Sequence, residues 1–369
     1  MAGPEWIPAA LLPNLFAQEA VDAEVISLAP RYDPRVDVFC AIHPTIGDLL
    51  SHYTNAFNDA VDPVVLIVRA DLLAKIGTVE ALASFRDLVS LSVIPYSRAL
   101  SVLSPHPRGV LYSNSFAFYP WMLGTDNEHL IAQTPAMRAL HVVEEFHGQS
   151  SPELPEMMLS ELDQTLFNAL LRRWKRYYLG NRHRWQDRAL FRSLNMANQA
   201  AQLPASIDTT LYDLGRIAAL WVSAFEILAH PRTGNSGLNS VYPLFERVSY
   251  LTSRVGRKMY AAYMSHKRPW PRRSLPCWLY GKLYKARCAF LHGNPVRISL
   301  LSPKNYGVGL FWLAPCLYRL ALAGFLDLAY TKRIPSLTAP EKLGEYIGEE
   351  MRFEQYQKSI ESALLKARR

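Results

Sequence analysis

The sequence predicts two regions of different fold class: an α+β region over residues 1–150, followed by an all-α antiparallel helical bundle. Apolar runs in the first region are short and bounded by turn residues, whereas apolar residues in the second recur with the 3.6-residue period of helices. The charge changes as well, because residues 1–150 carry a net charge of −8 and residues 151–369 carry +16. A chain of 369 residues is long enough for two domains.

Short apolar runs predict strands and one helix in the first region. Pro63–Ala70 and Leu88–Ser97 have the length and the β-branched content of buried strands. Between them, residues 71–88 space Leu, Ile and Ala as a helix does. Ser113–Leu123 is rich in aromatic residues and contains a proline, which suits an edge strand or a packed loop. The region contains no glycine-rich phosphate loop and no internal repeat.

A segment rich in proline and serine, residues 147–157, is interpreted as the linker between the regions. Helices are expected after it, in a domain over residues 158–335 and a charged, exposed or partner-binding helix over residues 340–369. Asp208 is expected to cap one of the helices. The expected helices cover residues 158–181, 184–203, 208–230, 238–253, 257–267, 274–292, 308–331 and 341–369.

The composition favours a soluble, cytoplasmic protein. The N-terminal residues lack a basic segment and include Glu5, so no signal peptide is expected. The most apolar run, Val308–Ala329, contains Pro315, Arg319 and Asp327, which favours a buried helix over a membrane span. The four cysteines are too few and too scattered for a disulfide framework: Cys40, Cys277, Cys288 and Cys316.

Arg287 and His292 stand near the end of the helix expected at residues 274–292. Gly293 and Pro295 predict that this helix stops just after His292. Five positions separate the two side chains by about 140° around a helix, although a histidine in a frayed last turn is able to swing toward the arginine. Histidine titrates near neutral pH and a guanidinium grips phosphate, which is what metal-free RNA cleavage requires. The same spacing also arises by chance.

The motif and its surroundings resemble the HEPN superfamily (higher eukaryotes and prokaryotes nucleotide-binding), whose signature is Arg-x4–6-His near the end of a late bundle helix. Phe290–Asn294 and Leu220–Leu228 look like the Apea-like HEPN branch. The resemblance covers roughly residues 160–335. It implies a metal-independent endoribonuclease, often a toxin or an antiviral defence effector, that forms a homodimer and leaves a 2′,3′-cyclic phosphate. Residues 1–150 resemble no family and are expected to regulate the activity.

The resemblance assigns catalytic roles to Arg287 and His292. His292 would act as general acid or base, and Arg287 would bind the phosphate and stabilise the transition state. Members of the superfamily usually carry a polar residue after the arginine, where this chain has Cys288. Either the site lacks one hydrogen bond, or this chain binds RNA without cutting it. Asn294, just beyond the histidine, belongs to the same expected surroundings.

Glu226 lies in an apolar helix, where an unpaired carboxylate would cost several kcal/mol, so a partner is expected. Arg287 is one candidate, which would make Glu226 the residue that orients the catalytic arginine. A structural ion pair with Arg216 or Arg247 is the alternative.

Two clusters interleave cations with aromatic residues, Arg172–Tyr178 and His266–Arg273. Cations follow a phosphate backbone and aromatic faces stack on unpaired bases, which is typical of proteins that bind single-stranded RNA. The second cluster is favoured as an RNA-binding segment, whereas the first is interpreted as an amphipathic helix end. The candidate RNA-binding residues are Lys267, Arg268, Arg272, Arg273, Lys282 and Lys285.

Other chemistries are less favoured by the sequence. Cys277, Cys288 and His292 lack the usual spacing of zinc ligands, so neither a metal nor a cofactor is expected. Cys288 and His292 stand four apart and are able to form a nucleophile pair, but small apolar neighbours favour a structural thiol. The expected partners are RNA, such as tRNA or other single-stranded regions, and a second copy of the chain, with no membrane. The rival functions are a non-catalytic RNA- or nucleotide-binding module and a scaffold.

Overall fold

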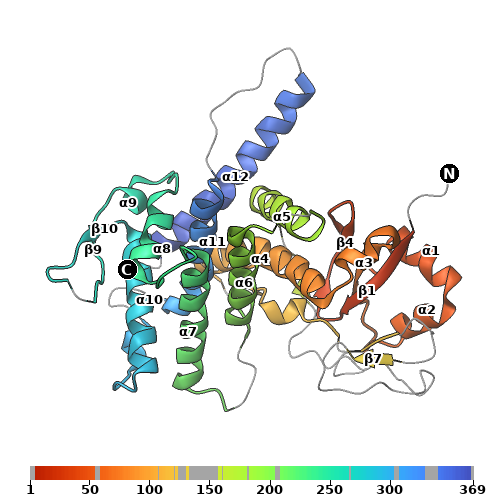
Figure 1. Ribbon diagram of the computed structural model, residues 1–369, viewed down its shortest axis with the longest axis horizontal. Coiled ribbons are helices and arrows are strands. Elements are labelled where there is room, and N and C mark those ends of the chain that lie inside the picture. The colour runs from red at the N-terminus through yellow and green to blue at the C-terminus, as the bar shows by residue number, and fades with distance from the viewer. Residues whose placement is uncertain are drawn as a thin grey trace. The chain divides into compact units, whose positions relative to one another are not determined.

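The computed structural model contains two compact units (Figure 1). One is formed by Met1–Arg86 and Leu111–Ser160, and the other by Asp87–Val110 and Glu161–Arg369. An α+β N-terminal region and a helical C-terminal region are confirmed. The structure describes residues 5–54, 59–106, 108–119, 121–123, 130–132, 157–159, 161–180, 183–203, 208–265, 267–302, 307–328 and 340–366.

The first unit is built on a four-stranded antiparallel sheet with the strand order β1-β5-β4-β3. The central strand β5 (Val64–Arg69) is almost wholly buried, as its apolar sequence predicts. It pairs on one side with β1 (Trp6–Leu12) and on the other with β4 (Ile26–Ala29). Strand β3 (Val21–Asp22) then pairs with β4.

Helices α1 (Pro34–Ile42) and α2 (Pro44–Ser51) pack against one face of this sheet. Val65 and Ile67 alternate along β5 and therefore share that face. Their core cluster consists of Leu11, Ala29, Val36, Leu49, Leu50, Tyr53, Val61, Val65, Ile67 and Tyr119. The other elements wholly within this unit are β2 (Leu15–Phe16), η1 (Ala70–Leu72), α3 (Leu73–Ile76), η2 (Ser113–Phe116), β6 (Trp121–Leu123), β7 (Leu130–Ala132) and β8 (Met157–Met158).

The prediction of a strand at Leu88–Ser97 is wrong, because these residues belong to helix α4 (Val79–Leu103). Every residue from Asp87 to Ala99 is buried. A helix that is buried on all sides carries no 3.6-residue pattern of polar and apolar residues, so its sequence resembles a buried strand. From Asp87 onward α4 belongs to the helical unit, where Ser90 donates a hydrogen bond to Asn198 (2.9 Å).

The helical unit thus extends beyond the domain that was expected over residues 158–335, since it includes residues 87–110 and the C-terminal helix. Helices α6 and α10 both pack along α7 (Figure 1). Residues 147–156 of the expected linker lie outside the described residues. The remaining elements are α5 (Gln164–Tyr178), α6 (Trp185–Ala200), α7 (Leu211–Leu228), α8 (Leu238–Glu246), α9 (Ser253–Gly256), β9 (Tyr260–Ala261), β10 (Arg272–Arg273), α10 (Leu275–Leu291), η3 (Ile298–Leu300), α11 (Leu310–Leu326) and α12 (Pro340–Lys366).

Helix α11 lies in the core of the bundle and is buried over most of its length, as its composition indicates. At Gly324 it approaches α8 so closely that a Cβ atom would lie 1.9 Å from the carbonyl oxygen of Leu244. Within the described part of the chain, no helix is both long enough and apolar enough to cross a bilayer.

The prediction of a helix at residues 257–267 is wrong. The segment contains β9, which pairs antiparallel with β10. Tyr260 and Ala261 form this pairing with Arg273 and Arg272, which engages backbone groups that a helix would have used. The cap expected at Asp208 is also wrong, since Thr210 and Asp213 form a capping box at the start of α7.

The charged C-terminal helix is present as α12, but its second half is not exposed as expected. Phe353, Tyr356, Gln357, Ile360, Glu361, Ala363 and Leu364 are buried. The Glu361 carboxylate accepts hydrogen bonds from the backbone N–H groups of Leu251 (2.9 Å) and Thr252 (2.7 Å). This half of α12 is therefore part of the bundle and is not a free docking surface.

Candidate active site

Helix α10 carries the predicted motif and ends where the sequence indicated. His292 is its C-cap, and Gly293 adopts the left-handed conformation with φ of 65°. The N–H groups of Gly293 and Asn294 bond to the carbonyl groups of Phe290 (3.4 Å) and Ala289 (3.0 Å), respectively. These two bonds form a Schellman motif, which fixes the end of the helix.

The end of α10 packs closely against the start of α7. Gly215 of α7 is buried, and a Cβ atom at this position would lie 2.2 Å from the ring of Phe290. Only glycine permits this approach, because any other residue would overlap the ring. The contact holds the last turn of α10 against the helix that bears Glu226.

Arg287 forms an ion pair with Glu226, which was one of the partners expected. Arg287 Nη2 and Glu226 Oε2 lie 3.9 Å apart, and the two side chains are 25% and 17% exposed. At this distance the pair is not hydrogen-bonded. The guanidinium carbon also lies 5.8 Å from the ring centroid of Tyr284. Arg216, an alternative partner, instead pairs with Asp213 (3.5 Å).

Several polar groups around this ion pair are buried without a hydrogen bond. Burial raises the pKa of Glu226, and the positive charge of Arg287 partly opposes that rise. Burial, followed by the charge of Glu226, also raises the pKa of Tyr280. Among the described residues, Arg287 Nε and the Tyr280 hydroxyl have no hydrogen-bond partner. The Arg287 side chain is 25% exposed and forms no hydrogen bond with another described residue, so it keeps N–H groups that are able to donate to an oxyanion.

Replacing Glu226 with Gln is expected to change how stability depends on pH. The raised pKa means that the folded protein binds this proton more tightly than the unfolded chain does. The free energy of unfolding therefore falls as the pH rises through the folded-state pKa. Urea denaturation between about pH 4 and about pH 7 should show Glu226→Gln gaining stability relative to the wild type as the pH rises. Glu354→Gln, at an exposed position, is the control, and an equal gain there would contradict the prediction.

His292 is exposed and remains in the helical phase, because its backbone N–H still bonds to the carbonyl of Cys288 (3.1 Å). It lies about 140° around the axis from Arg287. Within the described structure, the His292 side chain forms no hydrogen bond, ion pair or ring contact with Arg287 or with any other residue. A single chain therefore does not bring the arginine and the histidine together.

His292 ends a positively charged stripe on α10. Lys282, Lys285 and His292 share one face of the helix by their spacing. The ammonium group of Lys282 lies 5.3 Å from the ring centroid of Trp278, one turn earlier. Burial and the charge of Lys285 lower the pKa of Lys282. Lys285 is exposed, so the stripe offers cations and one aromatic face along the approach to His292.

The other candidate RNA-binding residues lie before the start of α10. Lys267 and Arg268 are exposed, and the guanidinium of Arg268 lies 4.3 Å from the ring centroid of Trp270. A cation stacked on an aromatic ring suits contact with single-stranded nucleic acid.

Arg272 and Arg273 differ in how free they are to bind a ligand. Arg272 is exposed and donates one hydrogen bond to the carbonyl of Met259 (3.3 Å). Arg273 pairs with the Glu246 carboxylate and lies 4.9 Å from the ring centroid of Tyr242. The structure thus leaves Arg272 more available to phosphate than Arg273.

The first cationic cluster, residues 172–178, lies at the end of α5, and two of its arginines form ion pairs that the sequence interpretation, an amphipathic helix end, did not include. Arg173 and Arg176 both pair with Asp187, a fully buried carboxylate of α6. Arg173 Nη1 donates to Asp187 Oδ1 at 3.0 Å, and Arg176 Nε donates to Oδ2 at 2.9 Å. These bonds join α5 to α6.

The cysteines have the surroundings of structural thiols. Burial raises the pKa of Cys277 to about 12 and that of Cys316 to about 12. Cys288 is partly buried. The described residues contain no group of three or more His, Cys, Asp or Glu side chains placed to hold a metal ion.

One signal in the sequence was missed. No Asp or Glu occurs between Glu246 and Asp327, although this interval contains 14 Lys and Arg. It includes α9, the β9–β10 hairpin and the whole of α10. A positive surface without carboxylates of its own favours a polyanionic partner.

The fold and the site define a helical domain that presents a basic helix ending in an arginine–carboxylate pair and an exposed histidine. No family model, no curated protein and no solved structure matches this chain.

Proposed function

We propose that this chain is a metal-independent endoribonuclease of the HEPN type. The observation that carries the proposal is the arrangement on α10. Lys282 and Lys285 lie on the helix face that ends at the exposed His292, and the partly exposed Arg287 near the same helix end forms no hydrogen bond with another described residue. We further propose that it acts as a toxin or an antiviral effector, with residues 1–150 as a regulatory region.

The proposed reaction is a transesterification. The 2′-oxygen of the RNA attacks the adjacent phosphorus as a base removes its proton. The bond from phosphorus to the 5′-oxygen breaks, and an acid protonates that oxygen, leaving a 2′,3′-cyclic phosphate. His292 serves as base or acid, and Arg287 stabilises the negative charge that develops on the phosphorane.

A homodimer would complete this site. The reaction uses a base and an acid, whereas the stripe on α10 ends in one histidine. Arg287 and His292 of one chain point in different directions around the helix axis. Two copies that face each other at this helix end would provide two histidines and two arginines in one cleft.

The neighbouring residues have supporting roles in the proposal. Glu226 orients Arg287 from 3.9 Å, a distance that leaves the guanidinium donors free for phosphate. Cys288 replaces a polar group and contributes one hydrogen bond fewer, while Asn294 is exposed beside His292. Lys282 and Lys285 contact the RNA backbone near the cut, and the segment from Lys267 to Arg272 contacts it farther away.

Cleavage of RNA by the purified chain in excess EDTA tests the proposal. We expect the single-stranded regions of tRNA or of short RNAs to be cut, with 2′,3′-cyclic phosphate at the product ends. A substrate with 2′-deoxyribose at the cleaved position should resist, because the attacking oxygen is missing. A requirement for added metal, or cleavage of the deoxy substrate, would contradict the proposed mechanism.

A non-catalytic RNA-binding module is the second candidate. It is favoured by the lack of contact between Arg287 and His292 and by Cys288 in place of a polar residue. This candidate predicts RNA binding that weakens steeply with salt and no cleavage under any of the conditions above.

A further inference from the structure

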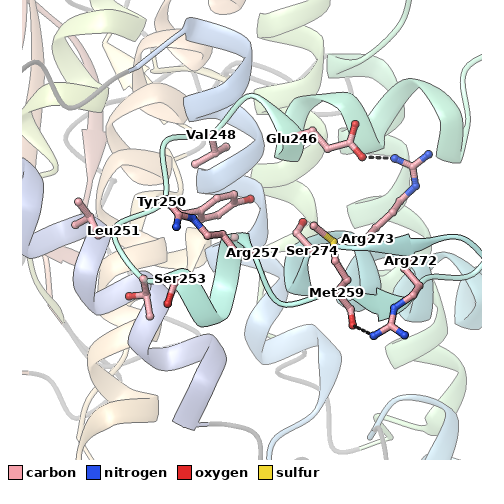
Figure 2. A pocket seen from close by; sticks show the side chains of 12 residues that line it. Glu246, Val248, Tyr250, Leu251, Ser253, Arg257, Met259, Arg272, Arg273 and Ser274 are labelled. Carbon is pink, nitrogen blue, oxygen red and sulfur yellow. Dashed lines mark hydrogen bonds and ion pairs between the residues drawn. The ribbon is translucent and has the colours of Figure 1, made fainter.

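A separate pocket is lined in part by Ser274, the N-cap of α10, and so lies at the opposite end of this helix from Arg287 and His292. Figure 2 shows the residues that line it. Its volume is about 560 Å³. The lining residues all come from the stretch between Glu246 and Ser274, which includes the end of α8, the loop into α9, α9 itself and the β9–β10 hairpin. A pocket of this size suits a small molecule.

The pocket has an excess of positive charge. It is lined by Arg257, Arg272 and Arg273 and by one carboxylate, Glu246, which pairs with Arg273 (Figure 2). Arg257 is exposed and forms no ion pair with another described residue. Arg272 uses one N–H group for the carbonyl of Met259. Two guanidinium groups are therefore left to bind an anion.

The arginines stand on two sides of the pocket. Figure 2 shows Arg257 beside Tyr250, and Arg272 and Arg273 across from them. The guanidinium group of Arg257 lies on the Tyr250 side, whereas that of Arg272 lies at the carbonyl of Met259. Both side chains are long and exposed, so an anion in the pocket is able to draw both guanidinium groups toward it. The neutral part of the lining contains hydroxyl groups and apolar side chains, namely Val248, Leu251, Ser253 and Ser274.

Contacts from outside the pocket hold its walls in place. A Cβ atom at Gly256 would lie 2.7 Å from the Tyr250 ring, so α9 and this ring are closely packed. Glu361 of α12 binds the backbone N–H groups of Leu251 and Thr252, which anchors the loop before α9. A pocket that is already formed avoids much of the free-energy cost of ordering on binding.

We propose that this pocket binds a small organic phosphate, a phosphomonoester with an organic group of about the size of a sugar. The planar guanidinium groups of Arg257 and Arg272 match the oxygens of a phosphate, whose double negative charge equals the two unpaired cations. The organic group would lie against Val248 and Leu251. The terminal 5′-phosphate of an RNA has the same chemistry. The site differs from the proposed cleavage site at Arg287 and His292. Arg272 also belongs to the segment proposed to contact RNA, so Arg257 is the residue that distinguishes the pocket from that segment.

Calorimetric titration of the full chain with ribose 5-phosphate tests this proposal, with ribose as the uncharged control. We expect saturable binding of ribose 5-phosphate and none of ribose. Arg257→Ala and Arg272→Ala should each weaken binding about tenfold, because each removes charged hydrogen bonds. Arg257→Lys keeps the charge and should bind more tightly than Arg257→Ala. Arg254→Ala, an exposed arginine of α9 that does not line the pocket, should bind as the wild type does.

The possible results distinguish a specific phosphate site in this pocket from nonspecific attraction of an anion to a positively charged surface. If Arg254→Ala weakens the binding of ribose 5-phosphate as much as Arg257→Ala and Arg272→Ala do, the attraction is nonspecific and the proposal is overturned. If neither ribose 5-phosphate nor a 5′-phosphorylated short RNA binds saturably to the wild type, or if ribose binds equally well, the proposal is also overturned. If a short RNA binds through Arg257 only when its 5′-end is phosphorylated, and ribose 5-phosphate does not, the phosphate is that of an RNA end. His292→Ala should bind ribose 5-phosphate as the wild type does. The proposed pocket therefore stands or falls separately from the proposed RNA cleavage.

Discussion

His292→Ala is expected to lower the rate of RNA cleavage by about 10²–10⁴-fold, the usual contribution of a general acid or base. His292 is exposed at the C-cap of α10, and its side chain forms no hydrogen bond, ion pair or ring contact with another described residue, so the substitution should leave the fold intact. Initial rates on a fluorescent RNA, with folding checked by circular dichroism, measure the effect.

Two further measurements separate a catalytic role from a structural one. His106→Ala, at another exposed histidine of the helical unit, should cleave at the rate of the wild type. The pH–rate profile of His292→Ala should lose the limb that belongs to the missing group, which a structural defect would not produce. Equal rates for His292→Ala and the wild type would exclude this residue from the reaction.

Asp163→Ala is expected to lower the free energy of unfolding by about 3–5 kcal/mol, because it leaves a buried charge without its partner. Arg319 is 1% exposed, and its Nε donates a hydrogen bond to Asp163 (3.0 Å). The same carboxylate caps α5 by accepting from the backbone N–H of Leu166 (3.1 Å). Arg319 also bonds to Gln357 of α12, so the loss should loosen several helices.

Urea denaturation followed by circular dichroism measures this effect, and Asp163→Asn separates its two causes. Asparagine keeps the capping oxygen but loses the charge, so most of the destabilisation should remain. A double variant, Asp163→Leu with Arg319→Met, removes both charges and should be more stable than Asp163→Ala. A double variant no more stable than Asp163→Ala would show that the cap, not the buried charge, accounts for the loss.

Local signals in the sequence were sufficient for part of the helical region. The C-terminal end of α10 follows from Gly293 and Pro295, and the left-handed glycine is present. Helix α6 was expected because its polar and apolar residues alternate with the helical period. These elements were predictable because each depends on residues within a few positions of one another.

Part of the candidate site was also predictable. A lone carboxylate in an apolar helix requires a partner, and Arg287 was one of the expected partners for Glu226. The pocket beside α9 was missed, because its loop is held by Glu361, more than 100 positions away in the chain. Lys285 and His292 stand seven positions apart, so helical spacing alone places them on one face, and this part of the site was also predictable from the sequence.

The sequence by itself determined the elements whose cause is local: the buried strand β5, the end of α10 at Gly293 and the basic character of the region after Glu246. Tertiary structure alone decided that residues 88–97 are helical, because complete burial removes the periodicity that distinguishes a helix from a strand. It also decided that the second half of α12 is buried, since Glu361 satisfies backbone donors of a distant loop. Such partners meet only once the chain has folded, so no local pattern records them.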